Sequence, residues 1–565
     1  MNKVKILLVF LIGSLASLAQ TKLPIPDTLS GKNISLNIHQ DSVRFFDGAY
    51  SKTYAFNQYS YLGPTLLLKK GEQVSILVLN QLIDTTTVHW HGLHVPSKWD
   101  GGPHTPILPG TVWNPTFTVL DQAATYWYHP HMHQKTAEQA IKGAAGLIIV
   151  RDSNEQSLAL PRSYGIDDFP LVIQCQQYDS ANQAMPLGMQ DSTILVNGAR
   201  ANYNKEVYAE MPAQIVRLRI LNASGERAFN FGFTNDFPFH IIGTDGGLLN
   251  YPVLSNRVRL GPGERVELLI NLTNKIGDSL YLMSYASELA MGIQGGPTMP
   301  MPSGPPMDSP LNGIDFKIMR ITVVAQTQQP ILLLPNTLAN NAPYTNASTT
   351  RTIRFTADND QVMDGPFYFN DSTFDMMRID YRIPLNQIER WKLVNNTMVA
   401  HPFHIHDVQF YLVERSGNLP AEYERGRKDV VLVPPFDSVE FITQFTDFTD
   451  SIIPYMFHCH ILMHEDAGMM GQFTVESNWT GFNEPLKMAE LISVYPNPAN
   501  HEIKLELPTQ VTQFDIKVVN MLGQSVLAKT DLGSSTINIE NLKQGSYIIF
   551  IKANDAFYYS KLLID

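Results

Sequence analysis

Short runs in which apolar and polar residues alternate recur along most of the chain, and Gly, Pro and Asn separate them. Runs of this kind, rich in Val, Ile, Leu, Tyr and Phe, are typical of β-strands joined by tight turns. Long stretches with the 3.6-residue period of an amphipathic helix are scarce. The pattern therefore predicts an all-β protein made of sandwiches of short strands.

Three of these runs resemble one another and indicate a weak internal repeat. They read VSILVLNQ near Gln81, VRLRILNA near Ala223 and ERWKLVNN near Asn396, and each is an alternating strand that ends in Asn. The chain of 565 residues is also too long for one ordinary hydrophobic core. We therefore expect three related β-domains, at residues 20–155, 160–325 and 330–478.

The first twenty residues, MNKVKILLVFLIGSLASLAQ, predict a secretory signal peptide. Two lysines precede an apolar run that ends near Leu18, and small residues surround a cleavage point after about Ala19. A membrane anchor is the alternative, but the run is shorter than the roughly 20 apolar residues that span a bilayer. We expect residues 1–19 to be removed and a soluble mature protein to be exported, since no later segment is long and apolar enough to span a membrane.

Composition narrows the classes of function. Hydrophobic residues make up 44% and charged residues 17% of the chain, which is ordinary for a soluble folded protein. The net charge of −12 argues against nucleic-acid binding. With only two cysteines, the chain is not a disulfide-rich scaffold.

Most of the 16 histidines gather in four short clusters, and each cluster contains an H-x-H pair. With His133 left aside, the clustered histidines are His89, His91, His129, His131, His401, His404, His406, His458, His460 and His464. Residues two apart on a strand point to the same face, so each pair presents two imidazoles side by side. Four pairs can bring eight imidazoles to one site, which is too many for one metal ion and suits a cluster of three.

Cys459 lies between two of these histidines in the segment FHCHILMHEDAGMM. On a strand it faces away from both of them, so its thiolate belongs to a different metal site. We expect His401, His464 and a weak axial Met469 as its partners. Two imidazoles, one thiolate and a long thioether contact make a blue-copper electron-transfer site, and the backbone beside Cys459 connects that site to the imidazole cluster.

Zinc and a di-iron site are the competing assignments. Zinc also takes His and Cys ligands, but it has no redox chemistry, and its sites need four ligands, far fewer than this chain offers. A di-iron site needs carboxylate ligands, of which these clusters have few. The combination of Cys and Met therefore favours copper.

Four motifs resemble those of three-domain multicopper oxidases of the laccase and bacterial copper-efflux-oxidase type. The motifs are TTTVHWHGLHVPSKWDGGP, YWYHPHMHQKTAEQAIKGAAGLIIV, HPFHIHDVQFYLVER and FHCHILMHEDAGMMGQF, and the resemblance covers about residues 40–478. It implies three cupredoxin-like Greek-key β-domains and four copper ions. It also implies that one-electron oxidation of a reducing substrate is coupled to four-electron reduction of O2 to water.

The resemblance assigns ligands to each copper ion position by position, and no ligand of the family pattern is missing. The type 1 copper takes His401, Cys459, His464 and Met469. The type 2 copper takes His89 and His404. The type 3 pair takes His91, His129 and His460 on one ion and His131, His406 and His458 on the other.

Asp100 and Glu465 lie where the family places proton donors for O2 reduction. Asp100 stands in KWDGGP, and Glu465 follows the expected ligand His464. A carboxylate beside a cationic cluster stays ionised and can relay protons through bound water. The alternative is structural, with Asp100 capping the turn before Gly101 and Glu465 bracing a ligand.

The reducing substrate stays open between phenols or aromatic amines and Cu(I). Copper-efflux oxidases bind Cu(I) through Met and Asp residues near the type 1 histidine, but NNTMVAHPFHIH has no acid before His401. A Met- and Pro-rich segment, Met291–Pro310, either offers thioethers that suit Cu(I) or is only a loop. A copper-binding or structural protein without oxidase activity is the remaining alternative, and the complete ligand set argues against it.

The end of the chain resembles the C-terminal sorting domain of the type IX secretion system. After a linker at about 479–490, residues 491–565 contain the Tyr-Pro-Asn-Pro turn at Tyr495 and the Gly-Ser-Tyr step at Gly545 that mark this domain. The resemblance implies the type IX machinery as a partner, passage through the periplasm, and release outside the cell or attachment to its surface. A small β-sandwich that binds carbohydrate or another partner is the alternative.

Overall fold

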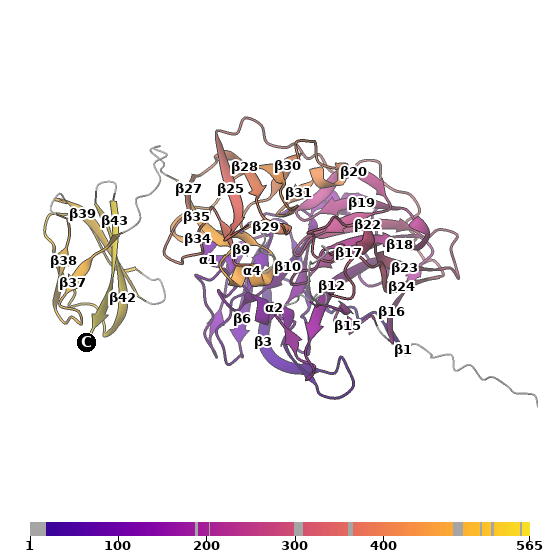
Figure 1. Ribbon diagram of the computed structural model, residues 1–565, viewed down its shortest axis with the longest axis horizontal. Helices are drawn as coiled ribbons and strands as arrows, with labels where there is room; N and C mark the ends of the chain where they lie inside the picture. Colours follow the sequence, from indigo (N-terminus) through magenta and orange to yellow (C-terminus); the bar gives the residue numbers. More distant parts are fainter. Residues whose placement is uncertain are drawn as a thin grey trace, which may run out of the picture. The chain divides into compact units, whose positions relative to one another are not determined.

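Figure 1 shows the fold of the chain in a computed structural model. The structure describes residues 19–186, 190–202, 204–298, 309–359, 365–477, 490–508, 511–520, 525–553 and 556–565. The chain divides into two compact units, Met1–Asn478 and Trp479–Asp565. Nearly all regular structure in the described residues is β-strand, so the predicted all-β class is confirmed. The predicted signal segment, residues 1–19, lies outside the described residues except for Ala19.

Apart from β1, which joins the middle block, the strands of the first unit fall into three blocks that follow one another along the chain, and each block forms two sheets. In the first block the sheet orders are β2-β5-β11-β10-β7 and β4-β3-β6-β8, with β9 beside β6. The strands are β2 (Thr28–Ser30), β3 (Asn33–Val43), β4 (Ser51–Phe56), β5 (Thr65–Lys69), β6 (Gln73–Asn80), β7 (His89–His91), β8 (Val112–Trp113), β9 (Thr116–Thr118), β10 (Ala124–His129) and β11 (Gly146–Arg151). Because β7 pairs with β10, the first two histidine clusters lie on neighbouring strands.

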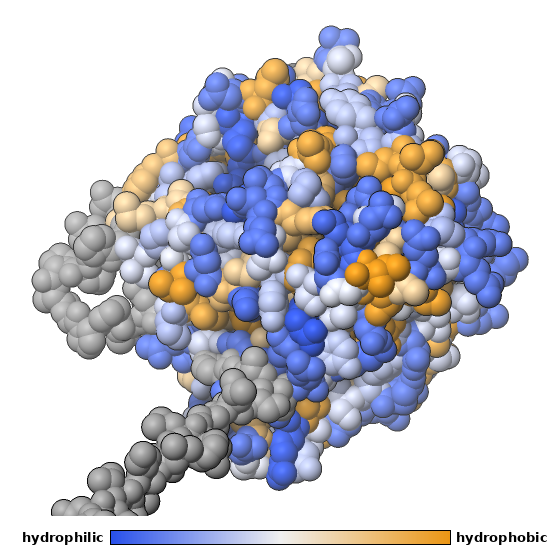
Figure 2. Space-filling view, turned by 90° about the vertical axis from the view of Figure 1, so that its right-hand side faces the viewer, coloured by the Kyte–Doolittle hydropathy of each residue, from blue (hydrophilic) through white to orange (hydrophobic). Residues whose placement is uncertain are grey.

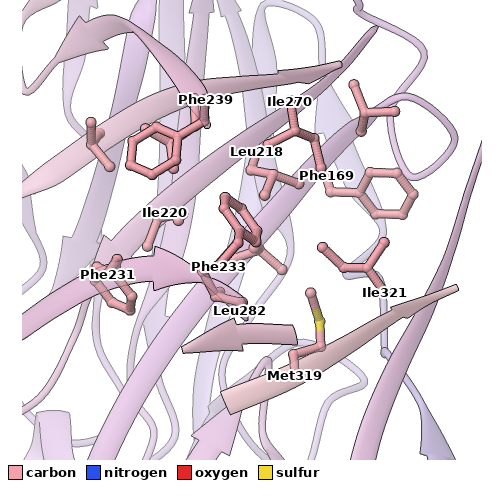
Figure 3. Close-up of a cluster of buried hydrophobic side chains, with 14 of the residues drawn as sticks. Phe169, Leu218, Ile220, Phe231, Phe233, Phe239, Ile270, Leu282, Met319 and Ile321 are labelled. Atoms are coloured by element: carbon pink, nitrogen blue, oxygen red, sulfur yellow. The ribbon is translucent and has the colours of Figure 1, made fainter. Parts of the chain in front are cut away.

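The middle block has the sheet orders β1-β16-β24-β23-β18-β21 and β15-β14-β12-β17-β22-β19-β20, with β13 beside β12. The strands are β1 (Ala19–Lys22), β12 (Asp168–Tyr178), β13 (Ala184–Met185), β14 (Thr193–Val196), β15 (Ala199–Arg200), β16 (Lys205–Pro212), β17 (Ile215–Asn222), β18 (Phe229–Phe233), β19 (Phe239–Thr244), β20 (Gly247–Ser255), β21 (Val258–Leu260), β22 (Arg265–Asn271), β23 (Ser279–Ser284) and β24 (Phe316–Val324). The two sheets enclose an apolar core, in which Phe169 and Leu218 of one sheet lie opposite Phe233 and Met319 of the other (Figure 3).

The third block has the sheet orders β26-β25-β28-β33-β30-β31 and β27-β35-β34-β29-β32. The strands are β25 (Thr349–Ala357), β26 (Phe367–Phe369), β27 (Tyr381–Pro384), β28 (Ile388–Asn395), β29 (His401–Ile405), β30 (Phe410–Arg415), β31 (Arg427–Lys428), β32 (Val430–Val433), β33 (Ser438–Gln444), β34 (Asp450–Cys459) and β35 (Met470–Glu476). Because β29 pairs with β34, the last two histidine clusters also lie on neighbouring strands.

The helices of the described residues are short and lie in loops. They are α1 (Ser97–Asp100), α2 (Thr136–Ile141), α3 (Ser153–Ser157), α4 (Leu462–Asp466) and the 3-10 turns η1 (Thr234–Asp236), η2 (Ala286–Glu288) and η3 (Glu422–Arg425). α2 packs against α4 (Figure 1), and the carboxylate of Asp466 accepts hydrogen bonds from the backbone N–H groups of Thr136 and Ala137 at 3.1 and 2.9 Å. This contact holds the loop after the second histidine cluster against the helix that carries His464.

The internal repeat has a physical basis in the Asn that ends three corresponding strands. In β6, β17 and β28, the side-chain oxygen of Asn80, Asn222 and Asn395 accepts a hydrogen bond from the backbone N–H two residues later, at 2.9, 3.1 and 2.9 Å. Each side-chain amide also donates to backbone carbonyls of nearby loops. The same residue therefore holds the same turn in all three blocks.

β17 differs from the other two repeated strands because both of its faces are buried. Its second face carries Arg217 and Arg219 instead of solvated residues. The Arg219 guanidinium pairs with Asp168 at 2.7 Å and donates to the hydroxyl of Thr125, in the first block, at 2.9 Å. The middle block is thus joined to the first block by buried, hydrogen-bonded charge.

The surface mixes hydrophilic and apolar residues, and on the face shown in Figure 2 the apolar residues gather in several separate patches. Leu333, Ile83 and Leu419 are among the most exposed large apolar side chains, and they lie in distant parts of the sequence. Scattered apolar side chains are ordinary on a folded protein and need no special function. Across the described ranges, no helix has the length and apolarity needed to cross a membrane.

The second unit consists of two sheets around a core of its own, which agrees with the predicted small β-sandwich. The sheet orders are β36-β43-β42-β39-β40 and β37-β38-β41. The strands are β36 (Glu490–Leu491), β37 (Ser493–Tyr495), β38 (Glu502–Glu506), β39 (Phe514–Asn520), β40 (Ser525–Leu532), β41 (Thr536–Asn538), β42 (Gly545–Ala553) and β43 (Ala556–Ile564). Ile503, Val518 and Ile549 are buried at its centre. The expected linker at 479–490 lies outside the described residues except for Glu490.

Candidate metal centre

Four strands bring the four histidine pairs to one buried place between the first and third blocks. In the first block His89 lies opposite His129 across β7 and β10, and in the third block His404 lies opposite His458 across β29 and β34. Rings from the two blocks then stack on each other. The ring centroids of His91 and His404 are 3.7 Å apart. The two strand pairs therefore meet face to face through their imidazoles.

The imidazole nitrogens fall into three groups, two of which share His406, and in each group they lie within 4.8 Å of one another. The groups are His89 with His404 and His406, His91 with His129 and His460, and His131 with His406 and His458. A further group joins His91 and His404 to the carboxylate of Asp429. All of these side chains are buried. The structure thus brings together the eight histidines that the sequence placed in one cluster.

One nitrogen of most of these rings faces an oxygen acceptor on the outside of the cluster. His89 and His404 each use Nδ1 for a backbone carbonyl, of Asp100 and of Asp429, both at 2.8 Å. His129 uses Nδ1 for the carbonyl of Pro130 at 2.9 Å. A ring proton on the outer nitrogen leaves the inner nitrogen with a lone pair, which is the tautomer that binds a metal.

Inner nitrogens of neighbouring rings lie close together, and with the ring protons on the outer nitrogens they turn lone pairs toward one another. His131 Nε2 lies 3.1 Å from His458 Nε2, and His91 Nδ1 lies 3.4 Å from His129 Nε2. The inner Nε2 atoms of His89 and His404 and both ring nitrogens of His460 are buried without any hydrogen-bond partner among the described residues. Opposed lone pairs repel, so the cluster is complete only with cations between the rings.

Burial also favours the neutral form of several of these imidazoles. It lowers the pKa of His131 and of His460 to about 3, against the raising effect of Glu465. It lowers the pKa of His91, His129 and His404 well below the usual value. Neutral imidazole is the form that donates a lone pair to a metal. These residues therefore fit transition-metal ions at neutral pH.

Cys459 forms a separate group on the other side of β34. Its Sγ lies 3.6 Å from Nδ1 of both His401 and His464. Burial raises the pKa of the thiol, so a thiolate there needs a bound cation. Met469 is buried in the same apolar cluster, and its backbone carbonyl accepts a hydrogen bond from the Cys459 N–H at 3.0 Å. The hydroxyl of Thr397 lies 2.8 Å from the outer nitrogen of His401.

Asp100 and Glu465 both contact the imidazole cluster, and each is 1% exposed. The Asp100 carboxylate lies 2.6 Å from Nδ1 of His406. The Glu465 carboxylate lies 3.4 Å from Nδ1 of His131 and 3.2 Å from Nδ1 of His458. Each acid therefore stands where it can both orient ligand rings and hold a proton beside them.

An acid that the sequence did not reveal lies near the Cys459 group. Glu226 follows Gly225, whose carbonyl accepts a hydrogen bond from Leu462 N–H at 3.0 Å, so this loop of the middle block lies beside α4. Burial and then the charge of Asp191 raise the pKa of Glu226 to about 7. The charge of Glu226 in turn contributes to the raised thiol pKa of Cys459. Glu226 lies far in sequence from every motif, so no sequence pattern could have identified it as part of the site.

Other chemistry-bearing residues are placed outside these groups. His94 Nδ1 lies 2.7 Å from the carboxylate of Asp407, and its Nε2 lies 3.1 Å from Asp447, so it bridges the first and third blocks. Cys175 is a buried free thiol. Neither residue belongs to a metal-binding group of the described residues.

Comparison with known proteins also points to a metal-containing protein, as the geometry does. Three family models described as multicopper oxidase match residues 37–155, 172–297 and 340–478. A fourth, described as a secretion system C-terminal sorting domain, matches residues 493–565. Together the four matches cover both units of the chain.

Individual relatives span most of the first unit. The multicopper oxidase mco of Staphylococcus haemolyticus is 33% identical over 453 residues, which are 79% of this chain and 88% of that protein. The cell division protein FtsP of Photorhabdus laumondii is 30% identical over 464 residues, 80% of this chain and 92% of that protein. The solved laccase-like multi-copper oxidase CueO from Ochrobactrum sp., which has oxidase activity towards lignin model compounds, is 30% identical and has a TM-score of 0.69 over 80% of this chain and 100% of its own.

The bridge at His94 predicts a pH dependence of stability. Burial lowers the pKa of His94, but the charge of Asp407 and its other acidic partners outweigh burial and raise it to about 10. The stabilisation is therefore fully present below the unfolded pKa of about 6.5 and is lost as the pH rises through about 10. We expect His94→Gln to lose about 2 kcal/mol at pH 6.5, a value discounted for the solvated Asp447.

Unfolding by denaturant at pH 6.5 and pH 10, with wild type and variant in the same metal state, measures this dependence. The difference in unfolding free energy between the two proteins should shrink towards pH 10. An equal difference at both pH values would show that His94 contributes by packing and not by charge.

Proposed function

Since the chain belongs to the multicopper oxidase family and is a copper-dependent oxidoreductase that uses O2, we propose that it holds four copper ions and reduces O2 to water with electrons from a small organic reductant. One observation supports this proposal most strongly. Three groups of buried imidazoles and one buried group of a cysteine and two histidines lie on opposite sides of the same strand, β34. This is the donor set expected for copper, and several inner nitrogens have no other partner among the described residues.

The proposed ligands follow the groups found in the structure, except that His406, which belongs to two groups, is assigned to a type 3 position alone. The type 1 position would take His401, Cys459, His464 and Met469. The type 2 position would take His89 and His404. The type 3 positions would take His91, His129 and His460, and His131, His406 and His458. Copper at these positions would supply one-electron oxidation beside Cys459 and multi-electron reduction of O2 among the imidazoles.

The backbone of β34 supplies the connection between the two places. Cys459 is bonded through single peptide units to His458 and His460, while its own side chain faces His401 and His464. Electrons accepted on the thiolate side therefore have a covalent route of a few bonds to the imidazole side. A separate pair of sites in different parts of the fold would lack this route.

Asp100 and Glu465 are proposed as the proton donors. Formation of water consumes protons, and both carboxylates lie against ligand rings where bulk water does not reach. The carboxylate of Asp100 can hold a proton beside Nδ1 of His406, and the carboxylate of Glu465 can hold one beside His131 and His458. Carboxylates at the outer nitrogens can pass protons inward through bound water while they keep the rings oriented.

An organic reductant such as a phenol is the substrate that the Cys459 side supports best. Glu226 is an acid with a pKa of about 7 beside α4, and a general base works best with a pKa near the operating pH. It can take the phenolic proton when the phenol loses an electron. Thr397, at the outer nitrogen of His401, is a neutral hydroxyl and offers no charge to bind a metal cation.

Cu(I) is the second candidate, because the Met-rich segment starts beside the same group. The carbonyl of Gly292 accepts a hydrogen bond from the Ala400 N–H at 2.7 Å, next to His401. Met291, which precedes Gly292, is 55% exposed. Thioethers suit Cu(I). Residues 299–308, which hold most of the segment's methionines, lie outside the described residues.

The second unit is proposed to direct export. Its match to a secretion system C-terminal sorting domain supports the type IX machinery as the partner. The route we propose runs through the periplasm to the outside of the cell, where the oxidase unit is released or held at the surface. The unit has its own apolar core, so it can fold without the oxidase unit.

O2 uptake by the copper-loaded protein tests the proposed function. At matched concentrations, we expect a methoxyphenol to be oxidised faster than Cu(I), with one O2 consumed per four electrons. Glu226→Gln should lower kcat/KM for the phenol about 100-fold, since the base that takes the phenolic proton is lost. Glu422→Gln, which changes an exposed acid, serves as the control. Faster turnover of Cu(I) would favour the second candidate, and no O2 uptake with either reductant would contradict an oxidase.

Asp100→Asn separates proton supply from electron entry. The amide keeps the shape and can still accept the His406 hydrogen bond, so the blue absorption of the Cys459 group should be unchanged. O2 reduction should slow by about 10- to 100-fold, since one positioned proton donor is lost. Anaerobic reduction of the blue centre and steady-state O2 uptake measure the two steps, and unchanged O2 uptake would show that Asp100 only orients His406.

Deletion of residues 491–565 tests the sorting unit. We expect the shortened protein to remain folded and active as an oxidase but to stay in the periplasm. Cell fractionation and O2 uptake by each fraction measure both properties. Normal export of the shortened protein would exclude a sorting role.

A further inference from the structure

The outer side of His91 is held differently from the other rings. Its Nε2 lies 3.1 Å from the carboxylate of Asp429, whereas most of its neighbours turn Nδ1 outward to an oxygen. The same Asp429 also offers its backbone carbonyl to Nδ1 of His404 at 2.8 Å. One residue therefore decides which nitrogen each of two stacked rings turns inward, Nδ1 for His91 and Nε2 for His404.

Asp429 is itself held by Arg265 of the middle block. The two guanidinium Nη atoms lie 2.5 and 2.6 Å from the two carboxylate oxygens, which is a bidentate pair. Both side chains are fully buried. A carboxylate in this position needs the Arg charge to stay ionised, because burial alone would favour its neutral form.

Arg265 has a partner for every one of its N–H groups. Besides Asp429, its Nε donates to the carbonyl of Thr125 at 3.0 Å, and its Nη atoms donate to the carbonyls of Gly263 and Asp245 at 3.1 and 3.0 Å. Thr125 lies in β10, the strand that ends at His129. The guanidinium is thus fixed by the first, middle and third blocks at once, and it cannot turn without breaking contacts to each.

Two glycines allow this close approach. Gly92, next to His91, has a φ of +88°, and a Cβ there would lie 2.4 Å from the Asp429 carboxylate and 2.7 Å from Arg265 Nη2. Gly263 has a φ of +83°, and a Cβ there would lie 2.9 Å from the ring of His460. The loop before β22 therefore packs Gly263 against the ring of His460. Arg265, two residues later, holds the ring of His91 through Asp429.

We propose that Arg265 is a positioning residue of the copper cluster: through Asp429 it keeps the proton of His91 on Nε2 and so presents Nδ1 to the metal. The inference rests on the proposed function. The middle block holds none of the proposed ligands, and the loop Gly261–Arg265 is the means by which it completes the site. The ion pair thus serves metal binding and not only the attachment of one block to another.

A purely structural ion pair predicts a different result. Breaking a buried pair destabilises the fold whatever its neighbours are. A structural role would therefore lower stability without selecting between the imidazole cluster and the Cys459 group. The positioning role predicts selective loss of copper from the cluster, because partners of ligand rings change metal affinity by about 10- to 100-fold.

The experiment compares Arg265→Gln with Arg219→Gln. Arg219 also forms a bidentate buried pair in the same sheet, with Asp168, but it contacts no proposed ligand. Copper-loaded proteins are dialysed against a graded copper chelator, and the copper retained per chain and the blue absorption are measured. For Arg265→Gln we expect cluster copper to be lost at about 10- to 100-fold lower chelator concentration, with the blue absorption retained. Arg219→Gln should hold its copper like the wild type.

Several outcomes would overturn the proposal. Wild-type copper retention in Arg265→Gln would do so, and so would equal loss in the Arg219→Gln control or parallel loss of the blue absorption. If Arg265→Gln does not fold, Arg265→Lys decides, since it keeps the charge and loses the bidentate geometry. Intermediate loss of cluster copper supports the proposal, and full retention overturns it. A wild-type protein that takes up no copper would overturn the proposed function, whereas full loading of the variants overturns the positioning role alone.

Discussion

Opposed lone pairs of buried imidazoles are the constraint on which the rest of the structure depends. Ring nitrogens of His131 and His458 face each other at 3.1 Å, and burial keeps His131 and His460 neutral. Among the described residues, the inner nitrogens of His89 and His404 and both ring nitrogens of His460 have no hydrogen-bond partner. A fold that holds such a cluster is complete only around metal ions, and the strands that carry the rings must be held rigidly enough to prevent the rings from turning away.

The surroundings of the cluster supply that rigidity. Most of the outer nitrogens face carbonyls or one of three buried acids, Asp100, Asp429 and Glu465. Asp429 is held by the charge of Arg265, and the helix that carries Glu465 is held through Asp466. The three blocks consequently act as one unit at this place, and the middle block takes part through Arg265 although it offers no ligand of its own.

The sequence predicted those features that depend on spacing along one strand. The H-x-H pairs and the position of Cys459 between two of them follow from the two-residue period of a β-strand, and the structure groups these residues as the period requires. The repeated strands were also visible, because the same Asn turn ends β6, β17 and β28. The all-β class followed from the same alternation of apolar and polar residues.

Features that depend on contacts between blocks were not predictable in this way. Glu226, Asp429 and Arg265 stand in ordinary strand or loop sequences, and only the packing of three blocks brings them to the site. The alternation of Arg and apolar residues in β17 gave no sign that Arg219 is buried against the first block. β1 falls within the expected first domain, but it pairs with β16 of the middle block, since parallel pairing of a short strand leaves no mark in sequence.

Diffraction from crystals of the copper-loaded protein, recorded on both sides of the copper absorption edge, tests the central claim most directly. The account predicts four anomalous peaks, one between His401, Cys459 and His464 and three among the eight remaining imidazoles. A single peak at the Cys459 group, or peaks with the absorption edge of zinc, would contradict it.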